Sequence, residues 1–465
     1  MLEVHWRQLS PVNSPKKAIN LMSAYKFVDL FSGCGGLSLG LAMAGLEGQF
    51  AVERDAMAFE TFSANFLSER KLPIGRFAWP SWLEKKAWSI DELLIQHLEQ
   101  LKSLEGRIEV LAGGPPCQGF SFAGRRNESD PRNQLFEKYV EVVKAIKPSV
   151  LMLENVPGMK VAHSKKRPSG EGCDASAESY YDKLKRSLED IDYEVHGELV
   201  DASRFGVPQK RTRLIVIGLK KNIAEALDGG VRQVFELLEK MRANHLKDLG
   251  LPESVSACDA LSDLTTRWHF KQPCVDPYSP KGFEEIVYDG PSSAYQKLMH
   301  KGCRKEAMDS MRLARHGDAV RERFARILAE CPRGVRMNEA NREQYSTKKH
   351  RIYPMDPWVP APTITTLPDD VLHYSEPRIL TVRESARLQS FPDWFQFRGK
   401  FTTGGALRTK ECPRYTQVGN AVPPLLARAI GHAISAVLDV TTRAAARRPS
   451  ADNCERADVE EVTVA

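Results

Sequence analysis

The sequence lacks the patterns that would place a protein in several broad classes. Its nine cysteines are scattered over 465 residues, and no two of them are spaced as CxxC. A disulfide framework or a structural zinc site needs paired or clustered thiols, so neither is expected. No apolar run approaches the roughly 20 residues that span a bilayer, and the segment MLEVHWRQLSPVNSPKKAIN has no apolar secretory core. These absences predict a cytoplasmic protein without a membrane partner or a bound metal.

An excess of charge of one sign is also missing. The chain has 66 Lys and Arg residues against 60 Asp and Glu residues, which gives a net charge of +6. This mild basicity favours a polyanionic partner but does not identify one. The length and the 42% hydrophobic content are enough for two or three packed units.

What is present, over the first half of the chain, is an alternation of short apolar runs and helical patterns. Strands are predicted at residues 26–30, 49–53, 108–112, 150–154, 193–199 and 213–218. Helices are predicted at residues 37–45, 56–66, 90–101 and 135–146, and an amphipathic helix at 416–438. Repeated β-α-β units predict an α/β fold with a doubly wound, Rossmann-like sheet, whose last two strands form a hairpin-like pair.

The pattern changes after Gly218, where polar segments, turns and arginines replace the strand–helix alternation. One segment there, RLARHGDAVRERFARIL, has helical periodicity. We predict a catalytic domain at 25–220 that is completed by 411–440, a smaller second domain at 221–410, and flexible termini at 1–24 and 441–465.

The glycine-rich segment DLFSGCGG, residues 29–36, lies between the first predicted strand and a helix. Glycines there permit a tight turn and a close approach to a ligand. Glu53 ends the next strand, twenty residues after Gly33, where its carboxylate can accept hydrogen bonds from both hydroxyls of a ribose. The spacing is neither GxGxxG nor GxxxxGK[ST], and no lysine follows to meet a phosphate. S-adenosylmethionine therefore suits the site better than NAD or ATP, although the glycines alone could be only a turn.

A single cysteine, Cys117, lies in the constrained loop GGPPCQGFS after strand 108–112. Glu154 ends strand 150–154, and one helix separates the two strands. Such strands are expected to be adjacent and parallel, so the thiol and the carboxyl group meet at one sheet edge. The alternatives are a buried inert thiol and a solvated strand end. Because two prolines and two glycines shape the loop, burial of Cys117 is the weaker interpretation.

This pair suits chemistry on a pyrimidine. Cytosine C5 is too weak a nucleophile to accept a methyl group directly, but a thiolate that adds at C6 makes C5 nucleophilic. A carboxyl group at N3 assists the addition, and loss of the C5 proton with elimination of the sulfur restores the enzyme. No histidine adjoins Cys117, so its activation must come from substrate, backbone dipoles or arginines.

These segments resemble motifs of the DNA cytosine-5 methyltransferases. DLFSGCGGLSLGL is similar to the family's first motif, GGPPCQGFS to its nucleophile loop, ENV to its glutamate motif and PQKRTRLIVIG to its QxRxR motif. RILTVRESARLQSFPDWF and YTQVGNAVPP resemble the last two, and all six occur in the family's order between residue 27 and about residue 436. The resemblance implies methyl transfer from S-adenosyl-L-methionine to C5 of a flipped-out cytosine in a specific duplex DNA sequence, through a covalent cysteine adduct at C6.

The resemblance also implies roles for single residues. Cys117 would be the nucleophile, Glu154 the partner of N3, Arg213 the group that holds cytosine O2, and Arg211 a support for the catalytic loop or the backbone. Without the resemblance, both arginines would be read as surface residues, and Asn420 equally as a helix cap. The implied cofactor-binding residues are Phe31, Gly33, Gly35, Glu53, Pro115, Leu135, Asn420 and Val422. The acidic residue that the family usually places near adenine is not identifiable; Asp91 and several glutamates are candidates.

Residues 219–375 resemble the family's target-recognition region by position rather than by sequence. Residues 301–351 contain 14 Lys and Arg against 7 Asp and Glu, a local balance of +7 that exceeds that of the whole chain. Such side chains would neutralise DNA phosphates, or they belong to a solvated, salt-bridged helix. The threonines of the segment PTITT, 362–366, resemble recognition-loop threonines. Ser121, Arg125 and Arg126 are candidates for filling the gap that a flipped base leaves.

The sequence thus predicts a bacterial DNA cytosine-5 methyltransferase that acts in restriction–modification or as a solitary modifier. Its expected partners are double-stranded DNA and a separately encoded cognate restriction endonuclease, and we expect a monomer associated with the nucleoid. Two alternatives remain, a tRNA cytosine-5 methyltransferase on the same scaffold and a catalytically inactive DNA-binding relative.

Overall fold

The computed structural model describes residues 25–116, 135–161, 179–304, 308–347, 351–403, 407 and 410–447. Its centre is a six-stranded sheet in the order β2-β1-β3-β4-β6-β5, in which β1 to β4 are parallel and β6 is antiparallel to both of its neighbours. The predicted α/β class and the antiparallel final pair are confirmed. The strands are β1 (Lys26–Leu30), β2 (Glu47–Val52), β3 (Val110–Gly113), β4 (Val150–Asn155), β5 (Tyr193–Asp201) and β6 (Thr212–Lys220).

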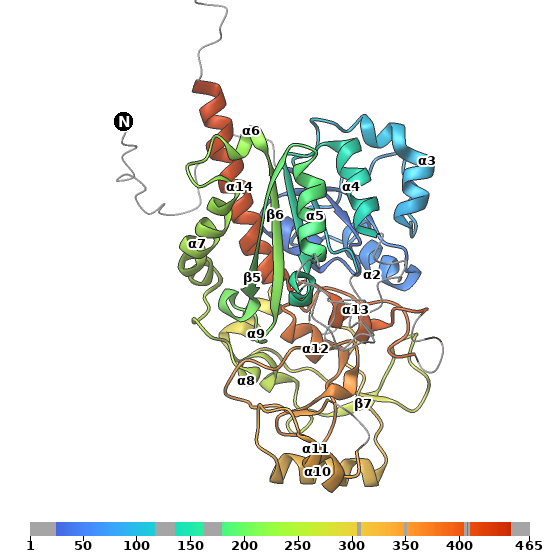
Figure 1. Cartoon of the computed structure of the whole chain (residues 1–465). Coiled ribbons are helices and arrows are strands. Elements are labelled where there is room, and N and C mark those ends of the chain that lie inside the picture. The colour runs from blue at the N-terminus through green and yellow to red at the C-terminus, as the bar shows by residue number, and fades with distance from the viewer. Residues whose placement is uncertain are drawn as a thin grey trace, which may run out of the picture.

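Helices cover both faces of this sheet (Figure 1). Successive side chains of a strand point to opposite faces, so Phe27 joins one apolar cluster and Val28 the other. One face is covered by α1 (Gly36–Met43), α2 (Ala56–Phe66), α7 (Gln233–Leu249) and α14 (Pro424–Arg447), and the other by α3 (Ile90–Lys102), α4 (Leu135–Ile146) and α5 (Tyr180–Glu189). The short α6 (Lys221–Ala224) follows β6 and packs on β5 and β6.

Residues 250–420 form mostly short elements with long irregular connections and lie below the sheet in Figure 1, whereas α14 returns to the sheet. The predicted helix RLARHGDAVRERFARIL is present as α10 but begins later, at Asp318, and buries Phe324, Ile327 and Leu328. The helices of this part are α8 (Ala257–Leu261), α9 (Ala294–His300), α10 (Asp318–Glu330), α11 (Glu339–Gln344), α12 (Val382–Leu388) and α13 (Arg414–Asn420). Its short strands are β7 (Lys271–Pro273), β8 (Glu284–Ile286), β9 (Tyr353–Pro354) and β10 (Val371–Leu372).

The carboxyl-terminal helix differs from its prediction at both ends. The sequence predicts one helix over 416–438, but α13 ends at Asn420 and α14 begins at Pro424. Pro423 and Pro424 interrupt it because proline lacks the amide hydrogen that continues a helix. At the other end, α14 continues to Arg447, so residues 441–447 are helical rather than part of a flexible terminus.

Residues 414–443 are long and apolar enough, by length and composition, to cross a membrane, but 72% of their most apolar window is buried inside the structure. The same helix, α14, packs against α1 and α7. Its apolar surface therefore belongs to the protein core.

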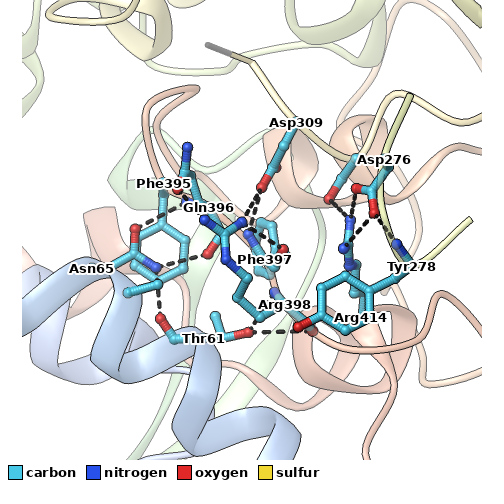
Figure 2. A network of polar contacts seen from close by, with 12 residues as sticks. Thr61, Asn65, Asp276, Tyr278, Asp309, Phe395, Gln396, Phe397, Arg398 and Arg414 are labelled. Carbon is cyan, nitrogen blue, oxygen red and sulfur yellow. Dashed lines mark hydrogen bonds and ion pairs between the residues drawn. The ribbon is translucent and has the colours of Figure 1, made fainter. Parts of the chain in front are cut away.

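A polar network fastens α2 to the segment after α12 (Figure 2). The Asn65 side chain donates to the Gln396 carbonyl (2.7 Å) and accepts from the Gln396 amide (2.9 Å). One turn earlier, the Thr61 hydroxyl accepts a hydrogen bond from the Arg398 amide (2.8 Å). The two halves of the chain are thereby held beside the same edge of the sheet.

Candidate active site

The glycine-rich turn after β1 and the carboxylate after β2 are in direct contact. The Gly33 amide donates to Glu53 Oε2 (2.9 Å), and the Asp55 amide donates to Glu53 Oε1 (2.8 Å). Burial raises the pKa of Glu53, while these two amides oppose the shift. Each carboxylate oxygen keeps a further lone pair that can accept from a ribose hydroxyl.

The backbone of the turn has the conformation that its glycines allow. Phe31, Gly33 and Gly35 have positive φ angles of 60°, 57° and 95°. A Cβ placed on Gly33 would meet nothing within 4 Å, so the turn leaves open space there. A Cβ on Gly35 would lie 2.4 Å from a ring atom of Phe66, so that glycine is required by packing. The turn follows the carboxyl end of β1, which has β2 on one side and β3 on the other. The strand order reverses beside β1, and such a point is the usual ligand position in sheets of this kind.

The turn before α14 packs against the glycine-rich turn, at Gly36. A Cβ on Gly36 would lie 2.4 Å from the Val422 carbonyl oxygen, so the two backbones are in close contact. Val422 is 7% exposed, whereas Asn420 beside it is exposed. Leu135, at the start of α4, and Phe31 both pack on the apolar cluster that covers one sheet face. The structure thus joins the Val422 turn to the glycine-rich turn, and it places Leu135 and Phe31 against the same apolar cluster.

The loop that carries the predicted nucleophile leaves β3 beside the end of β4. The Asn155 side chain donates to the Pro115 carbonyl (3.0 Å), and a Cβ on Gly114 would lie 3.7 Å from Glu154 Oε2. The expected parallel pairing of the two strands is confirmed. Cys117 itself, like Ser121, Arg125 and Arg126, lies outside the described residues. The chain is thus held against Glu154 two residues before the cysteine.

Glu154 faces an arginine from the neighbouring antiparallel strand. Arg213 Nε lies 2.9 Å from Glu154 Oε1, and the two side chains are only 13% and 11% exposed. Burial lowers the pKa of Arg213, and the Glu154 carboxylate opposes this shift. The pair places one acidic and one cationic group at the same sheet edge, as the sequence predicts for N3 and O2 of a cytosine.

Arg211 occupies a different position from Arg213. Its side chain is 2% exposed, and it donates to the carbonyls of Ile364 (3.0 Å) and Gly419 (2.9 Å). It makes no ion pair with Glu154, whose cationic partner is Arg213. Arg211 therefore binds backbone, which is one of the two roles implied for it.

Two polar residues of this edge had no individual role in the sequence-based prediction. Asn155 fixes Pro115, and its signal was present in the ENV motif. Gln209 is fully buried, accepts from the Ile364 amide (2.7 Å) and donates to the Leu388 carbonyl (3.0 Å). No periodicity or spacing predicts contacts between residues so distant in sequence.

The acidic candidate near adenine receives little support. Asp91 is exposed, and its nearest cation, the amine of Lys138, is 4.0 Å away. The segment before α3 instead contacts the backbone at the end of β2, because the Trp88 amide donates to the main-chain carbonyl of Glu53 (2.9 Å). Glu92 is engaged by Ser89 in a capping box at the start of α3.

Comparisons with known proteins identify the family of the chain. A family described as "C-5 cytosine-specific DNA methylase" matches residues 25–436. The type II methyltransferase M.DdeI of Desulfomicrobium norvegicum is 31% identical over 88% of both chains, and M1.HphI of Haemophilus parahaemolyticus is 29% identical over 88% of this chain and 86% of its own. A solved structure from E. coli, provisionally described as a prophage-encoded DNA modification methyltransferase, is 27% identical over 90% of this chain and all of its own, with a TM-score of 0.60. The chain therefore belongs to the C-5 cytosine-specific DNA methylases and is a DNA cytosine-5 methyltransferase.

Proposed function

We propose that this protein methylates C5 of a flipped-out cytosine in a specific duplex DNA sequence, with S-adenosyl-L-methionine as donor and a covalent Cys117 adduct at C6. The observation that carries the proposal is the Glu154–Arg213 pair, held beside the Pro115 loop and next to the contact between Gly33 and Glu53. The same edge of the sheet thus carries an acidic group, a cationic group, the start of the loop that leads to Cys117, and the turn that we assign to the nucleoside.

The residues of the turn fit S-adenosylmethionine. Glu53 would hold the ribose hydroxyls, Gly33 offers open space, and Phe31, Leu135 and Val422 supply apolar or backbone surface. Pro115, Gly35 and Asn420 complete the proposed set. The bound cofactor would supply an electrophilic methyl group on its sulfonium sulfur. The turn carries no lysine for a phosphate, in keeping with a donor that has none.

The protein residues divide the work on the cytosine ring. The Cys117 thiolate would form a bond to C6, and the electron pair of the C5–C6 double bond would move to C5. The carboxyl group of Glu154 would protonate or hydrogen-bond N3, and Arg213 would donate to O2. After C5 is methylated, a base removes the C5 proton and the C6–S bond breaks, which returns the thiolate.

We propose that the residues that read DNA lie within 221–410, in the part that follows α7. The earlier helices of this range, α6 and α7, pack on the sheet and on α14 and so belong with the catalytic domain. The basic stretch 301–351 and the threonines of 362–366 are its candidate DNA contacts. A restriction–modification role with a separately encoded endonuclease, a monomeric state and association with nucleoid DNA complete the proposal. The type II names of the relatives support this context.

The decisive test is Cys117→Ser in the full chain. We expect transfer of tritiated methyl groups to duplex DNA to disappear, while DNA affinity in gel-shift assays stays within about tenfold, because recognition rests on phosphate and base contacts elsewhere. Wild-type protein should form a covalent complex with DNA that contains 5-fluorocytosine.

Three outcomes would overturn parts of the proposal. Transfer by the serine variant would exclude the covalent route. Equal loss of DNA binding would contradict the separation of reading from chemistry. Transfer to tRNA instead of DNA would favour the alternative substrate. Bisulfite sequencing of DNA from cells that express the chain would also identify the target sequence.

A further inference from the structure

Arg211 joins two chain segments that are far apart in the sequence. It stands directly before β6, and its Nη1 and Nη2 donate to the carbonyls of Ile364 and Gly419, 153 and 208 residues away. Ile364 belongs to segment 361–366, which contains the threonines of 362–366 that we propose as DNA contacts. Gly419 belongs to 418–422, the turn that closes on the cofactor side. One side chain thus bridges the two proposed ligand sites.

The guanidinium is buried without a carboxylate. Arg211 makes no ion pair in the part of the chain that the structure describes, and its Nε has no hydrogen-bond partner there. Burial, aided by the nearby charge of Arg213 and opposed by that of Glu154, lowers the pKa of Arg211 well below its usual range. A buried charge whose hydrogen bonds go only to carbonyls is costly. If the only need were to join two carbonyls, neutral donors would serve at a smaller cost.

Segments 361–366 and 418–422 are in direct backbone contact. A Cβ on Gly419 would lie 2.3 Å from the Thr365 carbonyl oxygen, so the two backbones are in direct contact. On the DNA-reading side, the Ile364 amide donates to Gln209 Oε1 (2.7 Å) and the Thr363 hydroxyl to the Lys210 carbonyl (2.6 Å).

The cofactor side is equally tight. The Val422 carbonyl oxygen would lie 2.4 Å from a Cβ on Gly36, in the glycine-rich turn. A shift of segment 418–422 toward a bound cofactor must therefore move the Gly419 carbonyl, the Arg211 guanidinium or the Ile364 carbonyl.

We propose that Arg211 is a positioning residue that couples cofactor binding to DNA binding, by holding segments 361–366 and 418–422 in one arrangement. This inference rests on the proposed function. Because the coupling of two binding equilibria is reciprocal, DNA should tighten cofactor binding by the factor by which cofactor tightens DNA binding. Couplings of this kind are typically about 5- to 150-fold.

The test measures this coupling factor in the full chain. S-adenosylhomocysteine, which cannot donate a methyl group, is titrated calorimetrically with and without a saturating duplex that contains the target mapped by bisulfite sequencing. We expect wild-type protein to bind it at least fivefold more tightly with DNA. Arg211→Lys keeps the charge but loses the planar two-pronged donor, and Arg211→Gln loses the charge; both should reduce the factor to below twofold.

Arg383→Lys is the matched control. Arg383 is also fully buried, and it donates to the carbonyls of Pro392 (3.2 Å) and Phe395 (2.8 Å). Unlike Arg211 it pairs with a carboxylate, that of Asp309 (2.5 Å), and its side chain touches neither coupled segment. Its substitution should lower thermal stability while leaving the coupling factor unchanged. A purely structural Arg211 would behave in the same way as Arg383.

If the Arg211 variants do not fold, hydrogen exchange in the wild-type protein still tests the coupling. Saturation with S-adenosylhomocysteine alone should slow hydrogen exchange at the amides of residues 361–366. An unchanged exchange rate, a wild-type coupling factor near one, or full coupling in either Arg211 variant would overturn the inference. None of these results would affect the proposed function, which fails only if methyl transfer to DNA is absent.

Discussion

The sheet and residues 250–420 bury different kinds of side chain. In the sheet, β1, β3 and β4 are almost wholly buried and mostly apolar, and hydrogen bonds between strands satisfy their backbones. The later region has few such ladders, and it buries three arginines, Arg383, Arg387 and Arg414, at no more than 1% exposure. The first region depends mainly on apolar area, and the second on specific polar pairs.

The reason for the difference is that irregular segments leave carbonyls without backbone donors. Arg383 donates to three carbonyls, those of Asp309, Pro392 and Phe395, and Arg387 donates to the carbonyl of Ala260. Buried carboxylates compensate the charges these donors carry. This region can in this way be rigid without being a sheet.

The largest contrast is expected at the catalytic edge. Glu154→Gln keeps the shape of the side chain but removes the acid, so turnover should fall about 10²- to 10⁴-fold. The matched control Glu198→Gln changes a more exposed carboxylate on β5 of the same sheet and should leave turnover unchanged. Methyl-transfer rates on the mapped duplex decide the matter. A Glu154→Gln variant within threefold of wild type would remove this residue from the mechanism.

The second contrast concerns stability rather than rate. Arg387 lies between Asp393 (2.5 Å from Nε) and Asp263 (3.0 Å from Nη1), and all three side chains are at most 2% exposed. Arg387→Met leaves two buried carboxylates without their cation and should cost about 3–5 kcal/mol of unfolding free energy.

Arg204→Met provides the comparison, because Arg204 pairs with Glu239 while half exposed. Its removal should cost at most about 1 kcal/mol. Urea unfolding of both variants measures the difference. Equal losses of unfolding free energy in the two variants would show that buried ion pairs do not stabilise residues 250–420 more than an exposed pair does.

The smallest effect depends on pH and compares two buried aspartates. In the second region, burial alone would raise the pKa of Asp393, but Arg387 lowers it. In the sheet, the Asp29 carboxylate accepts a hydrogen bond from the Ser38 hydroxyl (2.5 Å) and has no ion pair among the described residues, and burial raises its pKa to about 7. Between pH 4 and 7 the unfolded chain ionises this group while the folded protein keeps the proton. The stability contribution of Asp29 is therefore lost as pH rises through this window.

Asp29→Asn removes that titration. The stability of the wild-type protein relative to the variant should fall from pH 5 to pH 7 by up to about 1.4 kcal/mol per pH unit, and should level off above pH 7. Urea unfolding at pH 5, 6, 7 and 8 measures the difference. A constant difference across this range would mean that Asp29 is already ionised in the folded protein.

The sequence by itself determined the sheet, the glycine-rich turn with Glu53, and the meeting of the GGPPC loop with Glu154. These follow from local patterns, because strand periodicity and the βαβ connection place successive carboxyl ends at one edge. The helix predicted over 416–438 was wrong at the prolines of AVPP, where the structure breaks it.

Only the tertiary structure decided how the second region is held and what Arg211 touches. The contacts of Arg211 with Ile364 and Gly419, and of Gln209 with Ile364 and Leu388, join residues more than 150 positions apart. Irregular backbone carries no periodicity from which such pairs could be inferred. Buried polar side chains choose their partners only once the surrounding chain has excluded water, so their pairing is a property of the fold.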